Sequence, residues 1–247
     1  MPHAACPRCD AGTVRFLGRL LLAPLARLIF RPRVIGRRNV PKRGGVIIAS
    51  NHLAFIDSIV LTLVARRSVS FMAKSAYFTG RGAKGRLQRA FFSGVGAVPV
   101  ERGAGSAAQD ALDAGLEVLR AGEAFSIYPE GTRSRDGRLY RGRTGVAWLA
   151  LTAGVPVVPV GLMGTDRMQP GGAGRIRFAR VTVRFGEPID LSGYGPATSG
   201  RARREATDAV MAAIQRLSGQ ELAGVYNEPP PANVRERVSR MLHRERR

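Results

Sequence analysis

Short apolar runs separated by segments of helical periodicity make up most of this chain. Apolar runs of about four to eight residues between turn residues are typical of buried strands. Near residue 181 the pattern alternates instead, with Val181, Val183 and Phe185 on one face, as in a strand covered on one side. One run contains Pro156 and Pro159, which cannot donate to a ladder, so that strand is expected to be irregular or at an edge. The expected strands are 33–37, 46–50, 69–73, 95–100, 124–128, 155–163 and 176–185.

Residues 106–120 show the clearest helical pattern. Ser106 and Gln109 form a capping box, apolar residues recur at helical spacing, and Gly122 supplies a stop. The other expected helices are 56–65, 144–153 and 201–217, with broken helix over 75–91. Strands that alternate with helices indicate an α/β fold. A chain of 247 residues suits one such domain, expected here over 31–225.

Residues 14–30 form an apolar run interrupted by Pro24. On a helical wheel, Arg15, Arg19 and Arg27 make a narrow stripe and the rest of the arc is apolar. Such a helix either lies in a membrane interface or packs on the domain core, and it is too short and interrupted to span a bilayer. We expect a membrane-interface helix over 14–30, a flexible leader over 1–13 and a basic tail over 226–247.

The charge of the chain is unusual. Lys and Arg total 39 against 18 Asp and Glu, which gives a net charge of +21, and almost all of the basic residues are Arg. This charge favours an anionic partner such as nucleic acid, an anionic membrane or a phosphorylated substrate, although base composition also raises Arg content. With one Trp and no interleaved aromatic and basic patch, the nucleic-acid alternative is the weakest of these.

The two cysteines, Cys6 and Cys9, are spaced C-x-x-C. A zinc ribbon requires a second pair, so the alternatives are a cramped site completed by His3 and Asp10, or an unstructured leader. We expect the two cysteines to lie in an unstructured leader, and we expect no metal site. Two thiols without further cysteines suit a reducing compartment.

His52 follows an apolar strand, where α/β folds present reactive groups. Asp57 stands five residues further on, and in a regular helix the two side chains would not face each other. They meet if His52 lies in the turn before the helix and Asp57 in its first turn. The carboxylate would then hold one imidazole nitrogen and leave the other as a base. The alternative is a core or capping histidine with a surface aspartate.

A second loop carries residues suited to an anionic ligand. In Tyr-Pro-Glu-Gly-Thr-Arg-Ser, residues 128–134, Gly131 allows close approach of the backbone and Arg133 offers a fork for phosphate. Lys74 and Arg102 stand at the ends of two expected strands and are further candidate cations. Each feature taken alone is also compatible with a solvent-exposed turn or a surface charge.

Four blocks occur in a fixed order: Asn-His-x4-Asp at 51–57, Val-Glu-Arg at 100–102, the 128–134 loop, and Val-Pro-Val-Val-Pro-Val at 155–160. Together they resemble the glycerolipid acyltransferase family, typified by 1-acyl-sn-glycerol-3-phosphate acyltransferases, over roughly residues 30–190. Tyr128 replaces the more usual Phe. The resemblance implies a single-domain glycerol-phosphate-acyltransferase-like fold with a mixed central sheet flanked by helices.

The resemblance also implies a site and a reaction. It makes His52 and Asp57 catalytic, with His52 taking a proton from an acceptor hydroxyl that then attacks the thioester of acyl-CoA or acyl carrier protein. The implied acceptor is 1-acyl-glycerol-3-phosphate, or another lysophospholipid or an amino lipid, at the cytoplasmic face of the membrane. It implies no bound cofactor. The implied substrate-binding residues are Asn51, Lys74, Arg102, Glu130, Gly131, Thr132, Arg133 and Ser134.

Overall fold

A computed structural model describes residues 32–100, 107–170 and 177–228 of the chain. The predicted helix over 14–30, the Cys6/Cys9 pair, the Ser106 cap and most of the basic tail lie outside these residues. Within the described ranges, no helix combines the length and the apolar character needed to cross a membrane.

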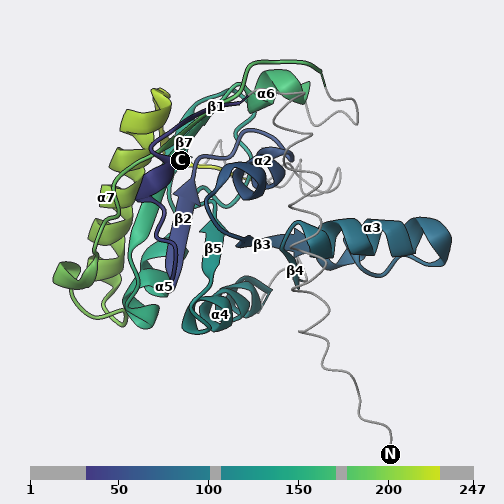
Figure 1. Ribbon diagram of the computed structural model, residues 1–247. Coiled ribbons are helices and arrows are strands. Elements are labelled where there is room, and N and C mark those ends of the chain that lie inside the picture. Colours follow the sequence, from purple (N-terminus) through teal and green to yellow (C-terminus); the bar gives the residue numbers. More distant parts are fainter. Residues whose placement is uncertain (1–31, 101–106, 171–176, 229–247) are drawn as a thin grey trace, which may run out of the picture.

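The core of the described chain is a seven-stranded mixed sheet (Figure 1). Neighbouring strands run parallel except for one antiparallel pair, β7 with β8. In order across the sheet, the strands are β1 (Arg33–Ile35), β8 (Thr182–Phe185), β7 (Val157–Met163), β2 (Val46–Ser50), β5 (Ala124–Ile127), β3 (Val69–Lys74) and β4 (Ala97–Val100).

Helices cover both faces of the sheet, and β2 is buried along its whole length between them. Ile47 and Ala49 pack with α4, α5 and α7, whereas Val46 and Ile48 pack toward α2. The α-helices are α2 (Asp57–Val64), α3 (Gly82–Gly94), α4 (Ala107–Arg120), α5 (Gly145–Ala153), α6 (Thr165–Met168) and α7 (Gly200–Ser218); η1 (Arg37–Asn39), η2 (Ser75–Tyr77) and η4 (Ser192–Tyr194) are short 3-10 turns.

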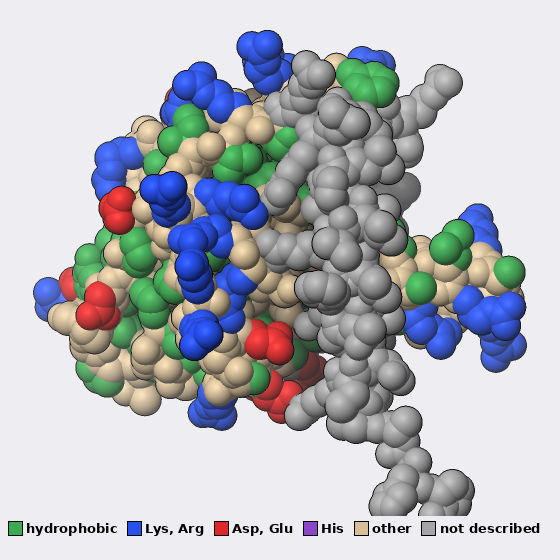
Figure 2. All heavy atoms as spheres, viewed as in Figure 1, with side chains coloured by type: hydrophobic (Ala, Val, Ile, Leu, Met, Phe, Trp, Pro, Cys, Tyr) green, Lys and Arg blue, Asp and Glu red, His purple; other side chains and the backbone are tan. Residues whose placement is uncertain are grey.

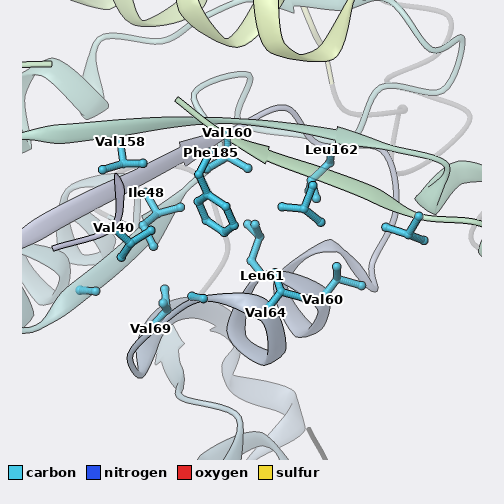
Figure 3. Packing of buried hydrophobic residues seen from close by; sticks show 14 of the residues in the cluster. Val40, Ile48, Val60, Leu61, Val64, Val69, Val158, Val160, Leu162 and Phe185 are labelled. Carbon is cyan, nitrogen blue, oxygen red and sulfur yellow. The ribbon is translucent and has the colours of Figure 1, made fainter. Parts of the chain in front are cut away.

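Figure 3 shows the packing on the α2 face. Leu61 and Val64 of α2 point toward Ile48 of β2, Val160 of β7 and Phe185 of β8. All of these side chains are buried, so α2 is fixed against the centre of the sheet. This packing sets where α2 begins, directly after the turn that carries His52.

The α/β class, the mixed sheet and the flanking helices predicted from the sequence are confirmed. The strand with two prolines was expected to be either irregular or at an edge of the sheet. It is irregular, and it lies inside the sheet between β8 and β2. Its ladder with β8 ends at the Val160–Phe185 pair and resumes at Val157–Ile189, with one extra residue on the Ile189 side. Pro159 lies in that interruption, where a missing N–H costs little.

A small parallel sheet of β6 (Leu139–Arg141) and β9 (Leu222–Tyr226) was not predicted. Strands this short contain too few positions for a periodic pattern to appear. The pairing carries the chain after α7 back to the 128–134 loop. There Asn227 donates from Nδ2 to the carbonyl oxygen of Arg133, at 3.1 Å.

Gly161 of β7 supplies a test of the packing between the sheet and α7. An added Cβ would lie 2.5 Å from the carbonyl carbon of Leu217 and 2.6 Å from the nitrogen of Ser218. These are backbone atoms of α7, which cannot rotate away. We expect Gly161→Ala to lower the free energy of unfolding by about 1–3 kcal/mol, measured by urea denaturation.

Gly193→Ala is the matched control, because nothing lies within 4 Å of its added Cβ and its φ is not positive. Its unfolding midpoint should stay near that of the parent chain. Equal midpoints for the two variants would show that α7 does not press on β7 at this point.

Candidate active site at the carboxyl ends of β2 and β5

Two adjacent parallel strands bring the two main sequence blocks together. β2 pairs with β5 in register, with Ala49 opposite Ile127, so the segments that follow both strands leave at the same edge. After β2 the chain turns to α2 on one face, and after β5 it continues to α5 on the other. Such a switch point between parallel strands is where open α/β sheets form their ligand crevices.

His52 and Asp57 face each other at this edge. His52 lies in the turn before α2 and Asp57 is the first residue of the helix, the arrangement that the spacing required. The imidazole Nδ1 lies 2.8 Å from Asp57 Oδ2. Asp57 is fully buried, whereas 16% of the His52 side chain is exposed. Because a carboxylate only accepts hydrogen bonds, the proton of the neutral ring sits on Nδ1 and Nε2 keeps its lone pair.

The same carboxylate oxygen shapes the turn. Asp57 Oδ2 also accepts from the backbone N–H groups of Leu53, at 2.7 Å, and Ala54, at 2.9 Å. The imidazole stacks on the ring of Tyr128, with 3.9 Å between centroids and 13° between planes. His52 is therefore held both in its plane and at its Nδ1 edge.

Tyr128 is fixed in turn by Ser58 of α2, whose hydroxyl lies 2.8 Å from the phenolic oxygen. Burial, together with the negative charge of Asp57, raises the pKa of Tyr128 well above 10. The phenol therefore remains neutral beside the imidazole. Tyr128 belongs to the 128–134 block, but the sequence does not predict its contact with His52, because stacking between residues 76 positions apart has no local signal.

Glu130 is fully buried beneath the turn. Its Oε1 accepts from the backbone N–H of His52 at 2.9 Å, and its Oε2 accepts from that of Tyr140 at 3.0 Å. Burial raises the pKa of Glu130 from 4.5 to about 7, and the two hydrogen bonds oppose this rise. The side chain thus joins the His52 turn to β6.

Asn51 and Ser134 also bond within the protein. Asn51 is buried and pairs with the backbone of Leu162 through both its amide nitrogen and its oxygen, at 2.9 and 2.7 Å. Ser134 donates its backbone N–H to the carbonyl of His52 at 2.7 Å and its hydroxyl to Asp136. The structure does not bring the side chains of Asn51, Glu130 or Ser134 to the cavity wall.

A cavity of about 450 Å³ opens beside the imidazole. Its wall carries two kinds of side chain: apolar and partly aromatic ones, which we call the apolar part, and hydroxyl and guanidinium ones, which we call the polar part. The apolar part includes Phe55, Ile59, Phe71, Met72, Tyr77, Phe92, Leu112, Ile127 and Val146, and the polar part includes Ser58, Thr132, Arg133, Arg143 and Thr144.

Of the predicted substrate-binding residues, the structure places Gly131, Thr132 and Arg133 on the cavity wall. Gly131 has a φ of +77°, and an added Cβ there would lie 2.9 Å from Nε of Arg143. The glycine therefore permits both the turn and the approach of a second guanidinium. Sequence reasoning missed Arg143, whose Arg-Gly-Arg-Thr-Gly context does not distinguish it in so Arg-rich a chain.

Two predicted cations have no described side chain. Arg102 lies outside the described residues, and of Lys74 only the backbone is described, at the end of β3 opposite Val100. Within the described ranges, no group of three or more His, Cys, Asp or Glu side chains is arranged to hold a metal ion.

The fold and this site define an α/β domain that presents a paired histidine and aspartate beside a cavity lined by both apolar and guanidinium side chains. Residues 31–163 match the family model described as Acyltransferase. The matched segment is more than half of the chain, and the chain belongs to this acyltransferase family.

Curated relatives agree with this assignment. The chain is 31% identical over 176 residues to the chloroplastic 1-acyl-sn-glycerol-3-phosphate acyltransferase LPAT1 of Arabidopsis thaliana, covering 70% of this chain and 48% of the relative. It is 24% identical over 190 residues to a 1-acyl-sn-glycerol-3-phosphate acyltransferase of Bacillus subtilis, covering 76% and 88%. The chain spans about half the length of the plant relatives at the greater identity.

The solved structure of the 1-acyl-sn-glycerophosphate (LPA) acyltransferase PlsC from Thermotoga maritima has the same fold. The TM-score is 0.60 at 24% sequence identity, over 87% of this chain and 84% of that one.

The raised pKa of Glu130 predicts a pH dependence of stability. Between pH 4.5 and about 7, the folded chain holds a proton on Glu130 that the unfolded chain has lost, so stability falls as pH rises through this window and levels off above it. Glu130→Gln cannot titrate. We expect the free energy of unfolding of the parent chain, relative to this variant, to fall by up to about 3 kcal/mol from pH 4.5 to 7.

Urea denaturation of both chains at a series of pH values measures this difference. A difference that stays constant with pH would mean that Glu130 ionises in the folded chain at its usual pKa.

Proposed function

We propose that the protein transfers a fatty acyl group from an acyl thioester to the free hydroxyl of 1-acyl-glycerol-3-phosphate, forming phosphatidate. The observation that carries this proposal is the His52–Asp57 pair, which leaves His52 lining the cavity with Nε2 outside any hydrogen bond within the described ranges, so that Nε2 can act as a base. The printed names of the relatives support the choice of acceptor. The proposed donor is acyl-CoA or acyl carrier protein, used as a co-substrate.

The residues suggest the sequence of proton transfers. Nε2 of His52 takes the proton of the acceptor hydroxyl while that oxygen attacks the thioester carbonyl carbon. The resulting imidazolium is stabilised by Asp57 at Nδ1. When the tetrahedral intermediate collapses, the carbon–sulfur bond breaks and the thiolate receives the proton from Nε2. The ester and free thiol are then complete without an acyl-enzyme intermediate.

The developing oxyanion requires hydrogen-bond donors. The N–H groups of His52, Leu53 and Ala54 already donate to Glu130 and Asp57. Thr132 and Arg133 line the cavity beside His52, and no backbone hydrogen bond in the described ranges uses their N–H groups. We therefore place the oxyanion against the backbone of these two residues.

The same loop suits the acceptor phosphate. The guanidinium groups of Arg133 and Arg143 stand on the polar part of the cavity wall and offer planar, bidentate donors. The apolar part suits an acyl chain. Because both lipids reside in membranes, we also propose that the enzyme works at a membrane surface, where the predicted helix over 14–30 and the net charge would favour anionic lipid.

His52→Ala tests the proposed base. We expect it to lower kcat for thioester-dependent acylation of lysophosphatidate in mixed micelles by about 10²–10⁴-fold, since a positioned base contributes about that much. Tyr128→Phe is the control, because it keeps the ring stack and loses the hydroxyl with its bond to Ser58, so its kcat should stay within about tenfold.

Substantial turnover by folded His52→Ala protein would contradict the mechanism. Turnover of another lysophospholipid or an amino lipid, but not of lysophosphatidate, would keep the chemistry and replace the acceptor.

Arg133→Ala tests the phosphate site. Hydrogen bonds to a charged group contribute about 1.5–3 kcal/mol, so the KM for lysophosphatidate should rise by at least about tenfold with a smaller change in kcat. Arg135→Ala is the matched control, because Arg135 is exposed in the same loop but does not line the cavity. Equal KM values for the two variants, or a rise only in the KM for the thioester, would place the acceptor phosphate elsewhere.

A further inference from the structure

Helix α3 extends away from the body of the protein (Figure 1). Only two of its 13 residues, Gly85 and Phe92, are buried. Leu87 is 73% exposed and Phe91 39% exposed. A helix that buries so little of its surface, yet carries large apolar side chains, has a face that no other part of the described chain covers.

The exposed apolar residues of α3 share one side of the helix. At about 100° per residue, Ala83, Leu87, Ala90 and Phe91 fall within an arc of about 100°, on the side away from Phe92. We call these four residues the α3 stripe. Lys84 and Arg86 flank the arc on either side. Basic residues beside an apolar stripe are typical of a helix that lies in a membrane interface.

The charge around α3 has one sign. Residues 75–100 contain four basic residues, Arg81, Lys84, Arg86 and Arg89, and no Asp or Glu. All four are exposed. Figure 2 shows hydrophobic and basic side chains together on the projecting helix. This charge complements anionic lipid headgroups and opposes close approach by a second copy of the same basic surface.

Aromatic contacts connect the α3 stripe to the cavity. The ring of Phe91 lies 5.5 Å from that of Phe92, which stacks on Tyr77 at 4.5 Å and contacts Phe55 at 6.2 Å. Phe92, Tyr77 and Phe55 all line the cavity beside His52. A series of aromatic rings therefore connects the exposed stripe to the cavity wall.

We infer that the α3 stripe is a membrane-docking surface that inserts into an anionic bilayer and directs the apolar part of the cavity toward it. This role is separate from the proposed reaction and from the predicted helix over 14–30. It requires Leu87 to enter the acyl-chain region while Lys84 and Arg86 contact headgroups.

Tryptophan fluorescence of the full chain tests the insertion without measuring turnover. Leu87→Trp introduces a reporter into the α3 stripe, and the native Trp148 packs against the core in α5. With vesicles of phosphatidylcholine and phosphatidylglycerol, we expect a blue shift of the new Trp and quenching by lipids brominated on their acyl chains. Tyr194→Trp is the control, since Tyr194 is 38% exposed but follows β8, which lies toward the other end of the strand order from β3 and β4, the strands on either side of α3.

Quenching at both positions, or at neither, would overturn the inference. A blue shift of the Leu87→Trp protein without vesicles would show instead that the stripe is covered by another segment of the chain or, if the shift depends on protein concentration, by a second copy. These fluorescence results do not depend on turnover, so failure of the proposed reaction would leave their interpretation unchanged.

A charge-matched pair of variants tests the headgroup contact. Since each basic residue near an anionic surface contributes about 1 kcal/mol, Lys84→Gln with Arg86→Gln should lower the vesicle partition constant by roughly thirtyfold. Lys42→Gln with Arg43→Gln removes the same two residue types from an exposed turn before β2, at the opposite edge of the sheet, and should have little effect. Equal losses would mean that net charge alone drives binding.

Discussion

The turn between β2 and α2 must satisfy its backbone N–H groups with little access to water, and the site depends on how it does so. The N–H of His52 donates to Glu130, those of Leu53 and Ala54 to Asp57, and that of Ile56 to Oε1 of Gln169 at 3.2 Å. Side chains rather than a ladder or a helix accept all four. The conformation that presents His52 is therefore set mainly by the carboxylates of two of the sequence blocks, Asp57 and Glu130.

This requirement connects the 51–57 block with the 128–134 loop. Asp57 lies at the start of α2 and holds its own turn, whereas Glu130 reaches across from the strand next in the sheet. Neither carboxylate has to touch a ligand to be needed. The raised pKa of Glu130 shows that burial disfavours its charged form. In return, the buried side chain links the His52 turn to β6 through its two hydrogen bonds.

Much of this could be predicted from the sequence, because apolar runs and helical spacing are local properties. The seven strands of the main sheet and the longer helices needed no more than that, whereas β6, β9 and α6 were not predicted and the meeting of His52 with Asp57 was one of two alternatives. Residues whose partners lie far along the chain were harder. Asn51 bonds to Leu162 only because β2 and β7 are neighbours in the sheet. Arg143 approaches Gly131 because the chain turns back after β6, where the N–H of Arg143 donates to the carbonyl of Pro129. The position of β7 inside the sheet could not be predicted either, because a proline can be accommodated at a bulge and no local pattern reveals the bulge.

The cavity joins two environments that a lysolipid also joins. Its apolar part, which includes Phe71, Met72 and Phe92, can bury an acyl chain, and removal of that hydrocarbon from water is favourable. Its polar part offers two guanidinium groups, and an acyl chain placed against them would cost free energy because it would remove their water without replacing the hydrogen bonds. His52 lines the same cavity. A ligand with an acyl chain, a phosphate and a hydroxyl between them can satisfy both kinds of side chain while its hydroxyl lies near Nε2. Selection of the acceptor and positioning of the reacting oxygen are then the same physical event.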